Sequence, residues 1–145
     1  MSKNIVKQGI KTSRTCVYNV NYHIVFSTKY RRKVLTESVE KILKEELEII
    51  AKSKNLILSS VEVGELDHIH LFVSAKPKET PSNIVKNIKG ITARKLFERC
   101  PEIKNKLWGG HLWNPSYYIE TIGSISEEAI KKYIDNQSKE PKKPV

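Results

Sequence analysis

Two histidines separated by a single residue are the strongest chemical signal in this chain. His68 and His70 lie in the segment Asp67-His68-Ile69-His70-Leu71-Phe72-Val73. In a β-strand, residues two apart point to the same face, so the two imidazoles would lie side by side while Ile69 and Leu71 face the core. Two imidazoles at this spacing suit chelation of one divalent cation. The spacing fits equally well with histidines that only form hydrogen bonds on a half-exposed sheet, and both interpretations stand.

A second signal is a tyrosine and a glutamine four residues apart. Tyr133 and Gln137 share one face of a predicted helix, about one turn apart. A tyrosine on an apolar stripe is ordinarily part of a core, but the amide of Gln137 needs a polar partner, and its oxygen can ligate a metal. Two imidazoles and an amide oxygen leave positions open on Mg²⁺ or Mn²⁺ for a phosphate oxygen.

Chemistry at a phosphodiester follows from this combination. A tyrosine beside a metal-bound phosphate can attack the phosphorus and store the bond as a phosphotyrosine, which allows rejoining without ATP. An unperturbed phenol has a pKa near 10 and is mostly protonated at neutral pH, and the sequence offers no dedicated base beside Tyr133.

The charge of the chain favours an anionic partner. The 145 residues carry a net charge of +10 at pH 7, with a pI near 9.6. One basic cluster, Lys29, Arg31, Arg32 and Lys33, surrounds Tyr30. Basic groups can hold phosphates while an aromatic ring stacks on a base, although a solvated loop after a strand has the same composition.

The remaining pattern predicts one domain with seven elements. Residues 1–15 are basic and polar without the apolar stretch of a secretory signal, and no apolar run is long enough to span a bilayer, so we expect a cytoplasmic protein. We expect a tail over 1–15, a single domain over 16–138 and a charged tail over 139–145. Periodicity and capping signals predict a β-α-β-β-α-β order with one more helix at the end. The expected elements are a strand over 16–26, a helix capped by Thr36 and ending at Lys54–Asn55, strands over 56–63 and 68–75 joined by a turn at Gly64–Glu65, a helix from Thr80–Pro81 to Pro101, a strand over 111–121, and a helix beginning near Ser124.

This order specifies the fold class. Two crossovers around a central hairpin give a ferredoxin-like (RRM-like) α+β fold, with an antiparallel sheet covered by helices on one face. The added C-terminal helix would carry Tyr133 and Gln137. The framework also serves RNA-binding modules and small enzymes, so the fold alone does not decide the function.

Four segments resemble, in order, those of a known enzyme family, over about residues 17 to 137. The histidine-hydrophobe-histidine segment at 67–73 resembles the motif of HUH endonucleases. The others resemble segments of the single-tyrosine transposases of small bacterial and archaeal insertion sequences: Tyr22 to Arg32 their first strand and loop, Trp108-Gly109-Gly110 with residues 113–118 their approach to the final strand, and Tyr133-Ile134-Asp135-Asn136-Gln137 their nucleophile motif.

The resemblance implies a role for each residue. Tyr133 would be the nucleophile, leaving a 5′-phosphotyrosine and a free 3′-hydroxyl, and His68, His70 and Gln137 would bind Mg²⁺ or Mn²⁺. The substrate would be single-stranded DNA with hairpins near the ends of the element. Such enzymes are typically homodimers whose last helix can complete the partner's active site. Candidate DNA contacts are His23, Lys29, Tyr30, Arg31, Arg32 and Arg94.

Three functions are compatible with these residues. The first is a metal-dependent DNA transposase that transfers strands through a tyrosine. The second is a domesticated HUH endonuclease that acts on chromosomal palindromes, which only the flanking DNA would distinguish. The third is a non-catalytic module that binds single-stranded nucleic acid on its sheet. The third gives no reason for two neighbouring histidines to converge with a Tyr/Gln pair.

Overall fold

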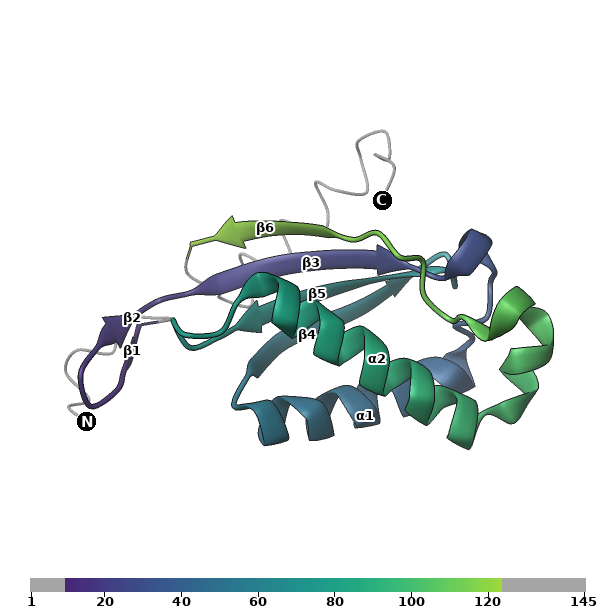
Figure 1. Cartoon of the computed structure of the whole chain (residues 1–145), viewed down its shortest axis with the longest axis horizontal. Helices are drawn as coiled ribbons and strands as arrows, with labels where there is room; N and C mark the ends of the chain where they lie inside the picture. The colour runs from purple at the N-terminus through teal and green to yellow at the C-terminus, as the bar shows by residue number, and fades with distance from the viewer. Residues whose placement is uncertain (1–9, 124–145) are drawn as a thin grey trace.

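A four-stranded antiparallel sheet is the framework of the protein. The computed structural model describes residues 10–123. The sheet has the spatial order β4-β5-β3-β6, and every neighbouring pair is antiparallel. Its strands are β3 (Asn21–Ser27), β4 (Ile57–Gly64), β5 (His68–Ser74) and β6 (Tyr118–Ile122). Helix α1 (Glu37–Lys54) connects β3 to β4, and α2 (Pro81–Arg99) connects β5 to β6 (Figure 1).

This arrangement confirms the predicted ferredoxin-like α+β class. The central strands β3 and β5 come from the two β-α-β halves and pair along their whole length, from Asn21 opposite Ser74 to Ser27 opposite His68. The predicted C-terminal helix, with Tyr133 and Gln137, lies outside the described residues.

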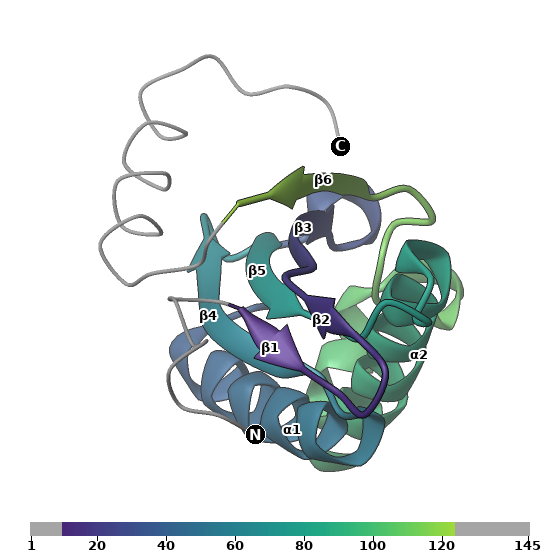
Figure 2. The ribbon, with the colours of Figure 1, turned by 90° about the vertical axis from the view of Figure 1, so that its left-hand side faces the viewer.

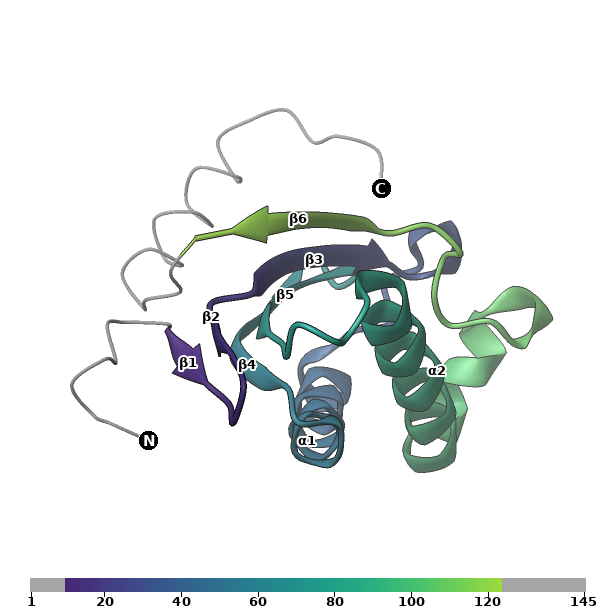
Figure 3. The ribbon, with the colours of Figure 1, turned by 60° about the vertical axis from the view of Figure 1, so that its left-hand side comes forward.

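Both helices lie on the same face of the sheet. Figures 2 and 3 show α1 and α2 side by side beneath the strands. The core between helices and sheet includes Ile24, Phe26, Ile69, Leu71 and Val73 from the strands, and Leu43, Leu47, Ile84, Val85 and Ile88 from the helices. Each such side chain stabilises the fold by roughly 1.5–3 kcal/mol relative to exposure. We call the opposite face, turned away from α1 and α2, the outer face.

The helix boundaries follow the predicted signals. Thr36 and Thr80 are the N-cap residues, and the Thr80 side chain accepts a hydrogen bond from the backbone N–H of Asn83. Pro81 occupies the first turn of α2, where its missing N–H costs nothing. Asn55 ends α1 in the left-handed conformation, with φ of 57°. Neither α1 nor α2 combines the length and apolar character needed to cross a bilayer, among the residues described.

Three boundaries differ from the sequence predictions. A tail was expected up to residue 15, but Lys11–Thr12 (β1) pairs with Val17–Tyr18 (β2) in a small hairpin, so the strand expected over 16–26 is divided into β2 and β3. The central turn is centred one residue later than expected, because Glu65 and Leu66 both adopt positive φ while Gly64 still belongs to β4. The last strand begins at Tyr118 instead of His111.

The late start of β6 has a physical cause in the preceding segment. Pro115 cannot donate a ladder hydrogen bond, and Trp113 turns into the core, where its indole N–H donates to Thr92 Oγ1 at 3.0 Å. The ammonium group of Lys89 donates to the carbonyl oxygens of Asn114 and Ser116. Residues 111–117 are therefore a loop anchored to α2, and this anchoring leads the chain into β6.

Candidate active site on the outer face of the sheet

The alternation along β5 places His68 and His70 on the outer face. Ile69, Leu71 and Val73 belong to the core on the helix side, so the two histidines between them point the other way. Their ring centroids are 5.2 Å apart, and both side chains are partly exposed. The predicted placement of the two imidazoles side by side is therefore confirmed.

His68 is held by a buried carboxylate. Its Nδ1 lies 2.8 Å from Oδ1 of Asp67, whose side chain is 6% exposed. Arg31 donates to both carboxylate oxygens of Asp67, from Nε at 3.2 Å and from a terminal nitrogen at 3.3 Å. Burial by itself would raise the pKa of Asp67, but the hydrogen bonds from His68 and Arg31, together with the guanidinium charge of Arg31, outweigh it and lower the pKa below its ordinary value. Asp67 is therefore a carboxylate at neutral pH and accepts the proton of His68 Nδ1.

Gly64 gives the ring of His68 its space. The two residues are directly opposite each other in the β4–β5 pair. A Cβ atom at position 64 would overlap Nε2 and Cε1 of the imidazole. Gly64 does not have a positive φ, so a side chain is excluded there by the neighbouring ring and not by the backbone.

His70 is joined to a second histidine on β3. His23 Nε2 lies 2.9 Å from Nδ1 of His70, and the two ring planes are inclined by only 8°. His23 also stacks on Phe72, with ring centroids 4.7 Å apart. On its other side, His23 Nδ1 lies 2.9 Å from a carboxylate oxygen of Glu120 on β6. Three strands thus contribute one line of side chains, Glu120, His23 and His70.

Burial determines the charge of His23. Its side chain is 0% exposed, and this burial lowers the pKa of His23 below 6.5, although the hydrogen bond and charge of Glu120 act in the opposite direction. His23 is therefore neutral at pH 7. Burial, together with the charge of Glu120 and a hydrogen bond to it, raises the pKa of the neighbouring Tyr118 phenol above 10.0.

The donor atoms of this site suit a cation on the imidazole side. Both Nδ1 atoms are engaged in hydrogen bonds, so each imidazole would ligate a cation through Nε2. The hydroxyl of Ser27, buried and directly opposite His68, has no hydrogen-bond partner among residues 10–123, and a water on a cation could supply one. Within this range, no three His, Cys, Asp or Glu side chains are grouped to hold a metal. The two imidazoles therefore fit a cation but need further ligands, and the predicted third, Gln137, lies outside the described residues together with Tyr133.

The basic cluster after β3 is close to His68. Lys29–Arg31 forms a 3₁₀ turn (η2) in which Tyr30 is 64% exposed and adopts a φ of 57°. The Lys29 ammonium lies 5.4 Å from the Tyr30 ring centroid. Arg31 has its guanidinium on Asp67, the residue before His68. The structure therefore brings this loop together with the histidine pair.

Backbone and side-chain contacts fasten this loop to the turn between β4 and β5. The backbone N–H groups of Thr28 and Leu35 donate to the carbonyls of Asp67 and Leu66, and Lys33 Nζ donates to the carbonyl of Glu65. Asp67 is held further by two hydrogen bonds from Arg31 to its carboxylate, by Thr28 Oγ1 at 3.3 Å from its carbonyl oxygen, and by Lys33 Nζ at 3.6 Å from its carboxylate. These contacts join residues 28–35 to residues 65–67. They also give hydrogen-bond donors to the backbone carbonyls of Glu65 and Leu66, two residues with positive φ.

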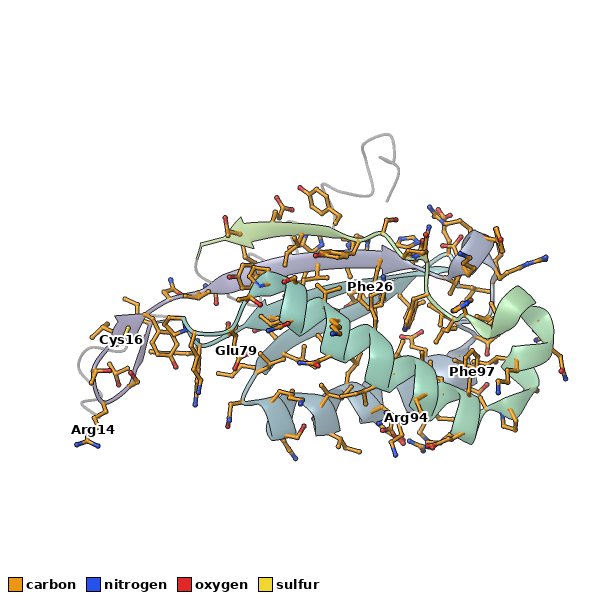
Figure 4. All side chains as sticks on the ribbon, viewed as in Figure 1. Arg14, Cys16, Phe26, Glu79, Arg94 and Phe97 are labelled. Atoms are coloured by element: carbon orange, nitrogen blue, oxygen red, sulfur yellow. The ribbon has the colours of Figure 1, made fainter. Side chains whose placement is uncertain are left out.

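Two predicted DNA contacts are placed differently from the others. His23 is fully buried, so its side chain contacts His70 and Glu120 and offers no surface to a ligand in this structure. Arg94 is exposed on α2, and Figure 4 shows it on the helix side of the molecule. The histidine pair lies on the opposite, outer face. Arg32 is half-buried next to the η2 turn. The structure joins Lys29, Tyr30 and Arg31 to the site and does not join Arg94 to it.

Sequence reasoning missed Glu120, gave no role to Asp67, and took Gly64 only as a turn residue. Asp67 could have been found, because a carboxylate beside a metal-binding histidine commonly orients it. Nothing near Glu120 in the sequence pointed to His23, since the two are 97 positions apart.

Sequence comparisons find similar proteins among known transposases. Residues 16–137 match the family model described as IS200-like transposase. The chain is 41% identical over 137 residues to the ISDra2 transposase TnpA of Deinococcus radiodurans, covering 94% of this chain and 97% of that protein. It is 30% identical to the transposase for insertion sequence element IS200 of Salmonella typhimurium, covering 86% and 81%.

Two solved structures of transposases have a similar fold. A crystal structure of a transposase from Deinococcus radiodurans superposes with a TM-score of 0.73 at 40% identity, covering 88% of this chain and 97% of that one. A REP-associated tyrosine transposase bound to a REP hairpin has a TM-score of 0.56 at 14% identity, covering 89% and 73%. The second likeness concerns the fold alone.

Proposed function

This chain belongs to the family of IS200-like transposases, and from that premise we propose that it cleaves and rejoins single-stranded DNA at hairpin-bearing element ends through Tyr133. In the proposed step, the Tyr133 oxygen attacks a backbone phosphorus and the bond from phosphorus to the 3′-oxygen breaks. The phenol proton ends on that oxygen, which leaves a 3′-hydroxyl and a 5′-phosphotyrosine. Attack by a 3′-hydroxyl on the phosphotyrosine reverses these changes and rejoins a strand.

The observation that carries this proposal is the pair of oriented imidazoles. His68 and His70 lie together on one face of the sheet, and each uses Nδ1 in a hydrogen bond, so Nε2 is the nitrogen through which each would ligate a cation. In the proposed site, these two nitrogens and the amide oxygen of Gln137 hold Mg²⁺ or Mn²⁺. When bound, the cation would polarise the phosphorus centre and offset the charge that develops on its oxygens.

The basic loop is the proposed path of the DNA backbone. Lys29 and Arg32 supply positive charge, and the exposed ring of Tyr30 offers a surface on which a base can stack. Arg31 has a second task in this proposal, because its guanidinium holds the Asp67 carboxylate that orients His68. The loop is fastened to the β4–β5 turn, so a phosphate bound there lies beside the histidine pair.

The substrate and assembly are also part of the proposal. The REP-associated transposase of the same fold is bound to a hairpin in its structure, and we propose hairpin-bearing single strands as the substrate here. We further propose a homodimer in which the segment with Tyr133 and Gln137 completes the site of its own or of the neighbouring subunit. The proposed place of action is the cytoplasm, where the DNA of a bacterial or archaeal element is found.

A covalent adduct tests the proposal. The protein is incubated with hairpin-bearing oligonucleotides and Mn²⁺ or Mg²⁺, and adducts are separated on denaturing gels. We expect a metal-dependent adduct with the unaltered chain and none with Tyr133→Phe. Tyr117→Phe, which alters a tyrosine 38% exposed in the described part of the chain, is the matched control and should form the normal adduct.

Two outcomes would contradict the proposal. A normal adduct yield from folded Tyr133→Phe would move the nucleophile to another residue. Tight, metal-independent binding with no cleavage of any hairpin substrate would instead identify a non-catalytic module that binds single strands on its sheet. Hairpin sequences on both sides of the gene would distinguish a mobile element from a domesticated enzyme.

A further inference from the structure

The hydrogen bonds on the outer face determine where the proton of each imidazole resides. A neutral imidazole has one N–H donor and one bare nitrogen, and only the bare nitrogen can ligate a metal. The nitrogen that carries the proton is set by its hydrogen-bond partner. The partners of His68 and His70 therefore decide whether the two rings can act as ligands through Nε2.

The line from β6 to β5 allows one assignment of protons. The Glu120 carboxylate accepts and does not donate, so Nδ1 of His23, 2.9 Å away, must carry a proton. With its ring proton on Nδ1 toward Glu120, the fully buried His23 has Nε2 as its acceptor nitrogen. The atom 2.9 Å from it is Nδ1 of His70, so this atom must be the donor. The proton of His70 is then on Nδ1, and its Nε2 is bare.

Ring geometry supports a hydrogen bond between His23 and His70 in preference to a stacking contact. The planes are inclined by 8°, yet the centroids are 5.2 Å apart, which is the separation of two rings joined edge to edge by a nitrogen–nitrogen hydrogen bond. The ring on which His23 does stack is that of Phe72, at 4.7 Å and 15°. Phe72 on one side and Glu120 at the edge fix the plane of His23, and His23 in turn fixes the plane of His70.

His68 reaches the same state through a different partner. Its Nδ1 donates directly to the Asp67 carboxylate at 2.8 Å, which leaves its Nε2 bare. One imidazole is thus oriented by an adjacent carboxylate, and the other by a carboxylate two strands away that acts through an intervening histidine.

From this geometry we infer that Glu120 and His23 are positioning residues, which act as a relay that holds His70 in the tautomer with a bare Nε2 and so prepares it to bind a cation. The part of this inference that concerns the cation rests on the proposed function, whereas the part that concerns the tautomer does not. His23, predicted as a DNA contact, takes a different role in it: it acts on the metal site from inside the sheet.

The tautomers can be measured without metal, DNA or catalysis. Long-range ¹H–¹⁵N spectra of histidine-labelled protein distinguish a protonated ring nitrogen from a bare one. The chain has four histidines, His23, His68, His70 and His111, so each signal can be assigned by a single replacement. We expect protonated Nδ1 and bare Nε2 for His68 and His70. A proton on Nε2 of His70 in the unaltered protein would overturn the inference, even if no variant can be purified.

Two variants at His23 separate positioning from simple packing. His23→Phe keeps a flat ring against Phe72 but removes the acceptor, so we expect His70 to populate both tautomers and the affinity for Mn²⁺ to fall roughly 10- to 100-fold. His23→Gln supplies an amide oxygen that can accept from His70 Nδ1, and we expect it to restore the tautomer and most of the affinity. The control is His111→Gln, which changes an exposed histidine and should alter neither quantity.

The outcomes separate this inference from the proposed function. If folded His23→Phe keeps both the His70 tautomer and the Mn²⁺ affinity, the relay has no positioning role. If the tautomers are as inferred but the unaltered protein binds no Mn²⁺, the relay stands and the metal part of the proposed function fails. If the His70 tautomer is as inferred but the protein forms no DNA adduct, the inference stands and only the proposed role of Tyr133 is contradicted.

Discussion

Gly64 and His68 face each other across the β4–β5 pair, and the imidazole of His68 fills the space that a side chain at position 64 would need. The glycine read from the sequence as a turn residue thus makes room for a candidate metal ligand. This close approach makes the site sensitive to a single methyl group.

We therefore expect Gly64→Ala to displace the His68 ring and to weaken Mn²⁺ binding by roughly 10- to 100-fold, the usual effect of disturbing the support of a ligand. Stability should change by no more than about 1 kcal/mol, since a strand tolerates alanine at least as well as glycine. Gly90→Ala is the matched control, because a Cβ there meets no atom within 4 Å. Mn²⁺ titration followed by electron paramagnetic resonance measures the effect, and an unchanged dissociation constant in Gly64→Ala would contradict it.

Bound metal should stabilise the folded protein. A ligand that binds only the native state at 100 times its dissociation constant adds about 2.7 kcal/mol to the free energy of unfolding. We expect the unfolding temperature to rise by several degrees with Mn²⁺ and to return to its starting value with EDTA. His68→Ala and His70→Ala should abolish the rise, while His111→Ala should retain it. A rise that persists in both site variants would place the cation elsewhere.

Tyr30 and Arg94 test which side of the sheet the DNA follows. Stacking of one base on an exposed aromatic ring contributes about 1–3 kcal/mol, so Tyr30→Ala should weaken oligonucleotide binding roughly 5- to 150-fold. Tyr30→Phe should keep most of the affinity. Arg94 lies on the helix side, so Arg94→Ala should change the affinity by less than about twofold, apart from its small share of the general charge effect. Fluorescence anisotropy at fixed salt is the measurement, and equal losses in the two alanine variants would indicate a path over the helices.

The contact between Trp113 and Thr92 should stabilise the entry into β6. Both side chains are buried, and the indole N–H has Thr92 Oγ1 at 3.0 Å. We expect Trp113→Phe and Thr92→Val each to lower the free energy of unfolding by about 1–3 kcal/mol, because each leaves a buried polar group without this partner. In a double-mutant cycle by urea denaturation, the coupling energy should be about 1 kcal/mol. Strict additivity of the two losses would show that the hydrogen bond contributes nothing.

The sequence predicted correctly those features that depend on a single strand or helix, such as the face on which a side chain lies or the residue at which a helix begins. A period of two placed His68 and His70 on one face, and Thr80 with Pro81 marked the start of α2. It was less informative about the last strand, because the aromatic residues at 113–118 look like a strand until Pro115 and the inward turn of Trp113 are considered.

Contacts between strands were beyond the reach of pattern reasoning. His23 meets Glu120 only because β3 pairs with β6 in the register that sets these two residues opposite each other. Residue types along a strand do not encode that register. For the same reason, His23 looked like a polar residue available to DNA, whereas its neighbours on both sides make it an internal link.

The joining of residues 28–35 to residues 65–67 has a thermodynamic consequence. A nucleic acid bound to Lys29 and Tyr30 contacts a loop that is hydrogen-bonded to Asp67, and Asp67 in turn holds His68. Each ligand then shifts the affinity for the other by the same factor, as linkage requires. The Mn²⁺ dissociation constant should change with a non-cleavable oligonucleotide by the same factor as the oligonucleotide affinity changes with Mn²⁺. We expect this factor to shrink in Arg31→Ala, which loses both hydrogen bonds from Arg31 to Asp67.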